Sequence, residues 1–539
     1  MRLVYVFASG TLILSSLANA ELKFNSDVTT SYVRHSSNSE AFSKRDSDIF
    51  TFEPSLGATY EANKIQGAAT VRYLQVSNNA SSASTDLNLD QNYNFTSFNY
   101  NGRLTAIDNV LSFTARGSQS YRNTIAGNAL VNDELYGSQE LSKTQSNSAG
   151  FNFSLSQGDW VRMGLEGNYS KVKSDRQVFL DSDLDTSNTS ITSQIYSGDE
   201  VKRVNWNLSG TYNETLGSGF NDSRSELYSG DFRIGLINEF SLVFTGQHEK
   251  NELSSESDGS DVSSNFNYSS YGAGLSWYQS SQRFIDLTYN RSTENEDESE
   301  NFLGLKFNWR FTSRTSLDGE YGRRFYGESG NLNLTHKIRK FQTQVTYEEN
   351  ITNYTRLIAG DTVTGSFVCP IGASQITECF QPATIDYVLQ PGEEFSNFNF
   401  IIPDITESDI IRKSLSTNIG YSYRKVQSSL TYRSTNTEYI DGSREQKTQT
   451  ISLDSSLQMN RKTTLSGSII YTTYDNTVDD DRLSADNDDV YTVTVNYTRK
   501  LNRDLNATVG FQHTTRASPV ENRDYDSNRL SLELVYTLF

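Results

Sequence analysis

The sequence predicts an all-β protein, a single antiparallel up-and-down β-barrel that spans a membrane. Three observations predict it. Apolar and polar residues alternate over many strand-length segments. The composition, with 31 Tyr, 29 Phe and only 6 Pro among 539 residues, is typical of strands and turns. Short and long connections also alternate along the chain, as they do in outer-membrane barrels.

The N-terminus has the pattern of a secretory signal peptide. Arg2 precedes an apolar run from Leu3 to Leu17, and Ala18-Asn19-Ala20 fits a cleavage site. The run is too short and too interrupted for a membrane anchor. We therefore predict a signal peptide at 1–20, a barrel at 21–539 and export from the cytoplasm. No later stretch approaches the roughly 18 apolar residues of a spanning helix, so the predicted location is the cell outer membrane.

The two-residue period predicts about 24 strands, with 22 or 26 left open. Alternation is clean at Phe151, Phe153 and Leu155, and it is weakest at 187–197. A strand at 187–197 is still required, because without it two long connections would follow each other. The predicted strands, in order, are 22–33, 48–61, 64–77, 86–106, 109–121, 143–157, 159–173, 187–197, 200–214, 222–236, 239–252, 264–280, 282–294, 299–312, 314–326, 329–339, 340–355, 410–424, 425–439, 444–459, 462–475, 487–500, 503–517 and 524–539.

The connections predict two rims of different character, with short turns on the periplasmic side and long loops outside. Long connections hold acidic runs such as Asp479-Asp480-Asp481, whereas several short turns, such as Arg424-Lys425, are basic. The acidic loops are either ordinary solvated loops or a surface that binds divalent cations or repels anionic polymer near lipopolysaccharide. The long connections are 34–47, 122–142, 174–186, 253–263, 295–298, 356–409 and 476–486.

One connection, 356–409, differs from the others. It carries Cys369, Cys379 and four of the six prolines. In an oxidising compartment the two cysteines are expected to form a disulfide. A long ordered loop is usually functional, and two readings stay open: the loop folds inward and narrows the bore, or it forms an extracellular cap.

In the C-terminal strand the terminal residue does not fall in the row of alternating apolar residues. Its apolar row is Leu530, Leu532, Leu534, Tyr536 and Leu538, which leaves the terminal Phe539 one residue out of register. A bulge near the end would reconcile the two patterns.

Several charged residues are candidates for the inner wall of the barrel. They would line an ion or sugar path, or brace the wall by hydrogen bonds. The chain offers no nucleophile elbow, no metal-binding histidine pair and no convincing carboxylate pair, so neither catalytic nor metal-ligating residues nor a cofactor is predicted. The lumen candidates are Arg162, Glu166, Arg233, Lys306, Arg310 and Glu320.

The middle of the chain resembles the PEP-CTERM-system-associated outer-membrane β-barrel family. The resemblance rests on Gly274-Leu275-Ser276-Trp277, on Leu332 to Tyr347 and most of all on the motif Gly322, Arg323, Arg324, Phe325, Tyr326 and Gly327. It implies an association with exosortase protein sorting and exopolysaccharide production, and it supplies no catalytic residues. Arg323 and Arg324 would face opposite sides of a strand, so we expect them near a membrane interface.

Two functions follow as expectations. The barrel is a conduit or accessory channel in the export or anchoring of exopolysaccharide or sorted surface proteins. Alternatively, it is a structural or adhesive surface protein with a closed bore. The expected partners are outer-membrane lipid, lipopolysaccharide and the barrel-assembly machinery, with extracellular polysaccharide or periplasmic export components for a conduit. No nucleic-acid partner is predicted.

Overall fold

The computed structural model is built almost entirely of β-strands. It describes residues 20–39, 44–82, 91–123, 134–135, 141–175, 184–201, 203–217, 221–257, 260–294, 298–352, 367–370, 393–396, 409–440, 444–478, 486–519 and 523–538. Within these ranges no helix has the length and hydropathy to span a membrane. The predicted signal peptide lies outside the described residues except for Ala20.

The described residues contain 26 strands, of which 24 form one sheet. The other two, β18 (Phe367–Pro370) and β19 (Glu393–Ser396), pair with each other inside the connection 356–409. The 24 strands of the sheet are β1 (Glu21–Ser39), β2 (Arg45–Glu61), β3 (Ile65–Ser82), β4 (Gln91–Ile107), β5 (Leu111–Asn123), β6 (Leu141–Leu155), β7 (Val161–Ser174), β8 (Leu184–Ser197), β9 (Val204–Gly217), β10 (Asn221–Ile237), β11 (Phe240–Ser257), β12 (Ser260–Ser280), β13 (Arg283–Glu294), β14 (Glu298–Thr312), β15 (Thr315–Arg324), β16 (Gly327–Lys337), β17 (Phe341–Thr352), β20 (Ile410–Tyr423), β21 (Val426–Tyr439), β22 (Arg444–Asn460), β23 (Thr463–Val478), β24 (Asp486–Lys500), β25 (Leu505–Ala517) and β26 (Tyr525–Thr537).

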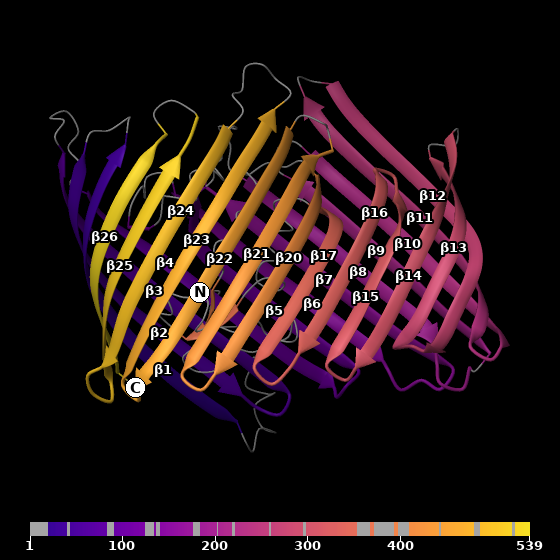
Figure 1. The fold of residues 1–539 in the computed structure, drawn as a ribbon, viewed down its shortest axis with the longest axis horizontal. Helices are drawn as coiled ribbons and strands as arrows, with labels where there is room; N and C mark the ends of the chain where they lie inside the picture. The colour runs from indigo at the N-terminus through magenta and orange to yellow at the C-terminus, as the bar shows by residue number, and fades with distance from the viewer. Residues whose placement is uncertain are drawn as a thin grey trace, which may run out of the picture.

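The sheet closes on itself (Figure 1). Each strand pairs antiparallel with the next, β17 pairs with β20, and β1 pairs with both β2 and β26. Closure removes the free edges that lipid could not satisfy. The predicted count of 24 is confirmed, and the weakest prediction, 187–197, lies within β8.

The strands extend further than predicted at one rim, which we call the long-loop rim; the opposite end is the short-turn rim. The predicted long connections 34–47 and 253–263 are wrong in extent, because β1 continues to Ser39 and β11 and β12 leave only 258–259 between them. Backbone pairing between neighbouring strands needs no apolar alternation, so the hairpins continue where the two-residue period of the sequence fades.

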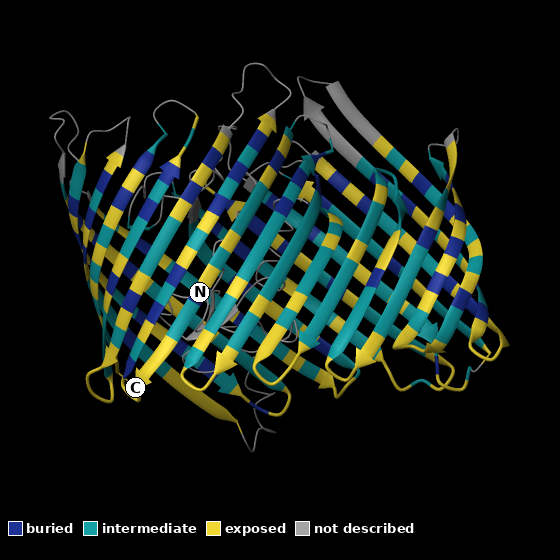
Figure 2. Cartoon of the chain, in the orientation of Figure 1, coloured by how far each residue is buried: buried dark blue, intermediate teal, exposed yellow. Residues whose placement is uncertain are grey.

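The two faces of the wall have opposite chemistry. On β13 the exposed row contains Leu287 and Tyr289, while Asp286, Thr288 and Asn290 are buried. Figure 2 shows this banding along the strands. Side chains crowd on the concave inside of a closed barrel and spread on the convex outside. The buried polar row therefore faces inward and the exposed apolar row outward, the reverse of a water-soluble sandwich.

The outward apolar row of the C-terminal strand continues to Leu538. Leu530, Leu532, Leu534, Tyr536 and Leu538 are all exposed on the outer face. The register of β26 with β1 and with β25 contains no bulge, so the predicted bulge is absent from the described part of this strand. Phe539 itself lies outside the described residues.

The connection 356–409 is described only at β18, β19 and Asp409. Cys379 and the side-chain environment of Cys369 lie outside the described residues, and so does the question of whether this loop folds inward. The disulfide stays a prediction.

Candidate functional site: the interior of the barrel

The six predicted lumen residues all occupy inward positions of their strands. Each alternates with outward apolar neighbours, as Arg233 does between Phe232 and Ile234. Arg162 pairs with Asp199 in a turn at the short-turn rim, and Arg310 donates to Gln282 Oε1 (2.7 Å) in another. Glu166 and Glu320 are exposed. Their predicted role as a path for ions or sugars stays a prediction.

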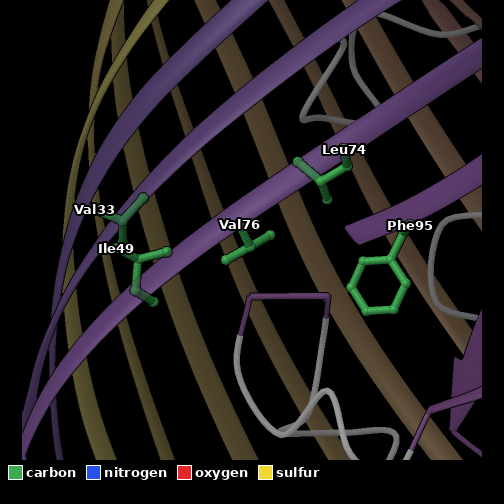
Figure 3. Close-up of a cluster of buried hydrophobic side chains, with 5 residues drawn as sticks. All are labelled: Val33, Ile49, Leu74, Val76 and Phe95. Atoms are coloured by element: carbon green, nitrogen blue, oxygen red, sulfur yellow. The ribbon is translucent and has the colours of Figure 1, made fainter. Parts of the chain in front are cut away.

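An apolar cluster interrupts the polar inner face of β1–β4 (Figure 3). It consists of Val33, Ile49, Leu74, Val76 and Phe95, and Val76 is fully buried. These positions alternate with the exposed residues of the outer face, so the cluster points into the bore. An apolar patch facing a wide aqueous bore would be unfavourable unless another part of the chain covered it.

The cover includes the dipeptide Glu134–Leu135, from the connection between β5 and β6. Leu135 packs against the apolar cluster, and its carbonyl oxygen accepts a hydrogen bond from Tyr93 Oη (3.0 Å). Arg72 donates to Glu134 Oε2 (3.0 Å) while also binding Glu53 through both carboxylate oxygens. Arg72 lies near the middle of β3, so this dipeptide is fixed about halfway down the inner wall.

A second interior site is a buried charge network near the short-turn rim. Arg233 on β10 donates to Asp231 on its own strand (2.6 Å) and to Asp286 on β13 (3.0 Å from Nε). All three side chains are less than a tenth exposed. Lys306 on β14 donates to Asp231 Oδ1 (3.1 Å), and the Ser276 hydroxyl donates to Asp286. Two carboxylates and two cations therefore balance in charge.

This network reveals a sharp bend in the wall. At about 4.8 Å per strand, β10 and β14 are roughly 19 Å apart along the sheet, yet Lys306 contacts Asp231 directly. Arg324 on β15 likewise pairs with Glu249 on β11. Strands β10–β15 therefore fold back on one another and form a narrow end of the barrel, held by ion pairs across the bore.

The family-like motif lies at the tip of the β15–β16 hairpin. Gly322, Arg323 and Arg324 end β15, Phe325 and Tyr326 form the turn, and Gly327 begins β16 with a positive φ of 113°. A φ in that region favours glycine. Arg323 pairs with the exposed Glu300 (2.7 Å), whereas Arg324 points inward to the fully buried Glu249. Both ion pairs lie close to the long-loop rim, and the predicted placement of the two arginines on opposite faces at a membrane interface stays a prediction.

Sequence reasoning identified Arg233, Lys306 and Arg324 but missed their partners Asp231, Asp286 and Glu249. It also missed Glu134–Leu135, because it considered an inward fold only for 356–409, where an extracellular cap stayed the alternative. The available signal was the apolar content of 122–142, where Leu130, Val131 and Leu135 occur in a connection otherwise expected to be solvated.

The interior presents side chains that can bind ligands and restrict passage along the bore. Among the described residues no group of three His, Cys, Asp or Glu side chains has the geometry of a metal site. The carboxylates of Asp231 and Asp286 are both held by Arg233. What the site provides is fixed obstacles along the wall and a polar surface between them.

Comparisons with known proteins agree with a barrel. The family model described as "Putative beta-barrel porin 2" matches residues 423–538, which contain the last six strands, β21–β26. No curated protein matches the chain.

Among solved structures, the chain is similar to the FrpB iron transporter of Neisseria meningitidis (F3-3 variant; 9% identity, 96% of this chain and 81% of that chain, TM-score 0.43). It is also similar to the siderophore receptor PirA of Pseudomonas aeruginosa (10%, 96% and 80%, TM-score 0.37) and to OpdQ of the same organism (10%, 96% and 100%, TM-score 0.31). Scores this low carry no inference about ligand or role. What these structures share with this chain is a barrel architecture already evident from its own strand pairing.

Proposed function

We propose that the chain forms a conduit in the bacterial outer membrane, used in the export or anchoring of exopolysaccharide or sorted surface proteins. The observation that carries the conduit is the reversal of polarity across a closed wall, with apolar side chains outside and polar side chains inside. Twenty-four strands give a backbone diameter of roughly 45–50 Å, too wide for wall side chains to fill. The exopolysaccharide and sorting role is supported by the sequence resemblance alone.

The test of the conduit is single-channel recording in planar bilayers. We expect large, steady current steps from the purified barrel, because an inner face of Asp, Arg, Ser and Thr side chains is wetted by water. A preparation that keeps its heat-shifted gel mobility but passes no current would contradict the conduit.

The second candidate is a structural or adhesive surface protein with a closed bore. It is favoured by the material anchored inside: Glu134–Leu135 on β1–β4 and the ion pairs that join the walls of the narrow end. Silence in bilayers by a folded barrel, together with loss of cell adhesion on deletion, would support this function instead.

If the outer face contacts lipid, a charge introduced at Leu287 should destabilise the barrel. This residue lies in an outward row with Leu275, Leu305 and Tyr321 on adjacent strands. Leu287→Arg should lower the free energy of unfolding in lipid vesicles by about 2–4 kcal/mol, the cost of a cation facing the bilayer interior.

The matched control is Glu166→Arg, at an exposed inward position, which should change the free energy of unfolding by less than about 0.5 kcal/mol. Urea titration followed by tryptophan fluorescence measures both variants. Equal losses for the two variants would mean that the outward row does not contact lipid.

A further inference from the structure

The short-turn rim divides into two arcs of opposite charge. Each of the five turns between β2 and β11 has a carboxylate in it or beside it, whereas each of the five turns between β14 and β25 holds arginine or lysine. The first set, the acidic arc, contains Glu61, Asp108, Asp159, Asp199, Glu200 and Glu239, together with the cations Lys64, Lys202 and Arg203. The second set, the basic arc, contains Arg314, Arg339, Lys340, Arg424, Lys425, Arg461, Lys462, Arg499, Lys500 and Arg503, and the turns of this arc hold one carboxylate, Asp504.

The basic arc is a continuous surface. Its strands follow one another around the sheet (Figure 1), and β14 and β25 are nine strand spacings apart, or roughly 43 Å along the wall. Hydrogen bonds connect neighbouring turns along the arc. They run from Lys337 N to Arg314 O (2.8 Å), from Ser422 N to Lys340 O (2.9 Å), from Lys425 Nζ to Met459 O (3.0 Å) and from Lys500 N to Lys462 O (2.8 Å).

The ten cationic side chains of the basic arc are exposed, and Figure 2 shows the turns of this rim in the colour of exposed residues. None of the ten forms an ion pair with a carboxylate in the described part of the chain. The whole chain carries a net charge of −19, so this concentration of positive charge does not follow from composition. Neighbouring cations repel one another unless anions from outside neutralise them.

One cation of the basic arc occupies a backbone position that arginine seldom takes. Arg424 has a φ of 55°, in the left-handed region. Asn109 and Asn238 adopt the same conformation in turns of the acidic arc, and asparagine is among the residues that tolerate it best. The geometry of the turn therefore does not account for an arginine at 424.

The best-defined part of the basic arc lies on the outer face of the wall. Lys340 Nζ is 3.7 Å from the centroid of the Tyr423 ring, and Arg424 Cζ is 5.1 Å from it. Tyr423 is exposed in the outward row of β20. One step deeper, the rings of Phe341 and Tyr421 are in contact at 4.8 Å. Apolar wall, aromatic ring and cation follow in the order expected across the boundary between hydrocarbon and lipid headgroups.

A phosphate group meets the requirements of this position. It carries negative charge, and both lysine and arginine donate charge-assisted hydrogen bonds to its oxygen atoms. An acidic polypeptide in the periplasm would approach the turns from below the rim. Lys340 and Arg424 instead lie over an outward ring, which favours a partner that lies beside the wall. Such a partner is a lipid.

We propose that the basic arc binds the phosphate headgroups of anionic phospholipids in the periplasmic leaflet, with Lys340, Tyr423 and Arg424 as its best-defined site. The acyl chains lie along the outward apolar row that begins at Phe341. This inference rests on the proposed outer-membrane barrel and adds a lipid partner on its outside.

The test places a photo-crosslinking amino acid, p-benzoylphenylalanine, at Phe341 or at Phe240 in the full chain. Both residues are exposed, and each begins a strand directly after a short turn, Phe341 in the basic arc and Phe240 in the acidic arc. The vesicles contain phosphatidylcholine with a minor share of phosphatidylglycerol. We expect lipid adducts at both positions, with a phosphatidylglycerol share about fivefold or more higher at 341, the ratio given by one cation near a lipid surface.

A charge variant tests whether the cations cause this selection. Lys340→Gln with Arg424→Gln should lower the phosphatidylglycerol share at 341 to that at 240. The matched control, Lys64→Gln with Arg203→Gln, removes the same charge from exposed residues of the acidic arc and should leave the share at 341 unchanged. Heat-shifted gel mobility confirms that each variant is folded.

Equal phosphatidylglycerol shares at 341 and 240 would overturn the lipid site and leave the membrane barrel standing. Binding of the barrel to immobilised poly-glutamate, lost in the Lys340 and Arg424 variant, would then assign the arc to an acidic polypeptide instead. A share at 341 that survives this variant, or that falls equally in the matched control, would also overturn the site. Absence of adducts at both positions would contradict a lipid-facing outer row and with it the proposed membrane barrel.

Discussion

Arg233→Met is expected to lower the free energy of unfolding by about 3–5 kcal/mol, because it leaves two buried carboxylates without their guanidinium partner. Asp231 and Asp286 are 5% and 3% exposed, and of their partners in the described part of the chain Lys306 and Ser276 would remain to compensate them. Urea unfolding of the folded barrel in detergent, followed by tryptophan fluorescence, measures the change.

The matched control for Arg233 is Arg162→Met. Arg162 also points inward and forms an ion pair, but its partner Asp199 is 80% exposed. Exposed pairs contribute about 0–1 kcal/mol, so this variant should unfold close to the wild type. The triple variant Arg233→Met with Asp231→Asn and Asp286→Asn should regain a large part of the loss. If the Arg233 and Arg162 variants unfold alike, the network does not hold the narrow end together.

Leu135→Glu is expected to increase the single-channel conductance. The new carboxylate would have to sit on Val76, Leu74 and Phe95, and burying an unpaired charge in apolar surroundings costs several kcal/mol. Glu134 and residue 135 should then leave the inner wall and free part of the bore. Planar-bilayer recording at fixed salt and voltage measures the step size.

Leu135→Met is the control, because methionine has a similar volume and stays apolar. It should conduct like the wild type, since the contact with the cluster and the hydrogen bond from Tyr93 are both kept. An unchanged step size in the Glu variant, with normal folding, would show that this dipeptide does not restrict the current.

The fold could be predicted almost completely because its signal is local. Each strand carries its own two-residue period, and the alternation of short turns with long loops required 187–197 to be a strand although only Ile191 and Ile195 mark it. The boundaries at the long-loop rim could not be predicted as well. There β11 and β12 stay paired through segments such as 253–257, whose sequence has no alternation of apolar and polar residues.

The interior could be predicted only in part. Alternation with apolar neighbours is enough to turn Arg233, Lys306 and Arg324 inward, but it does not say which residue each one meets. Apart from the contact of Arg233 with Asp231 two residues away, these contacts join residues 53 to 75 positions apart in the chain. No spacing rule connects them, because the contacts depend on how sharply the sheet bends between β10 and β15.

By itself, therefore, the sequence determined the faces, the order and the number of the strands, since hydrogen-bonded neighbours in a barrel are neighbours in the chain. Only the tertiary structure decided where the wall bends, that Glu134–Leu135 is fixed to the inner wall, and that Arg324 of the β15–β16 tip turns inward to Glu249. These are contacts across the bore. They depend on the curvature of the whole closed sheet, a property that no single strand encodes.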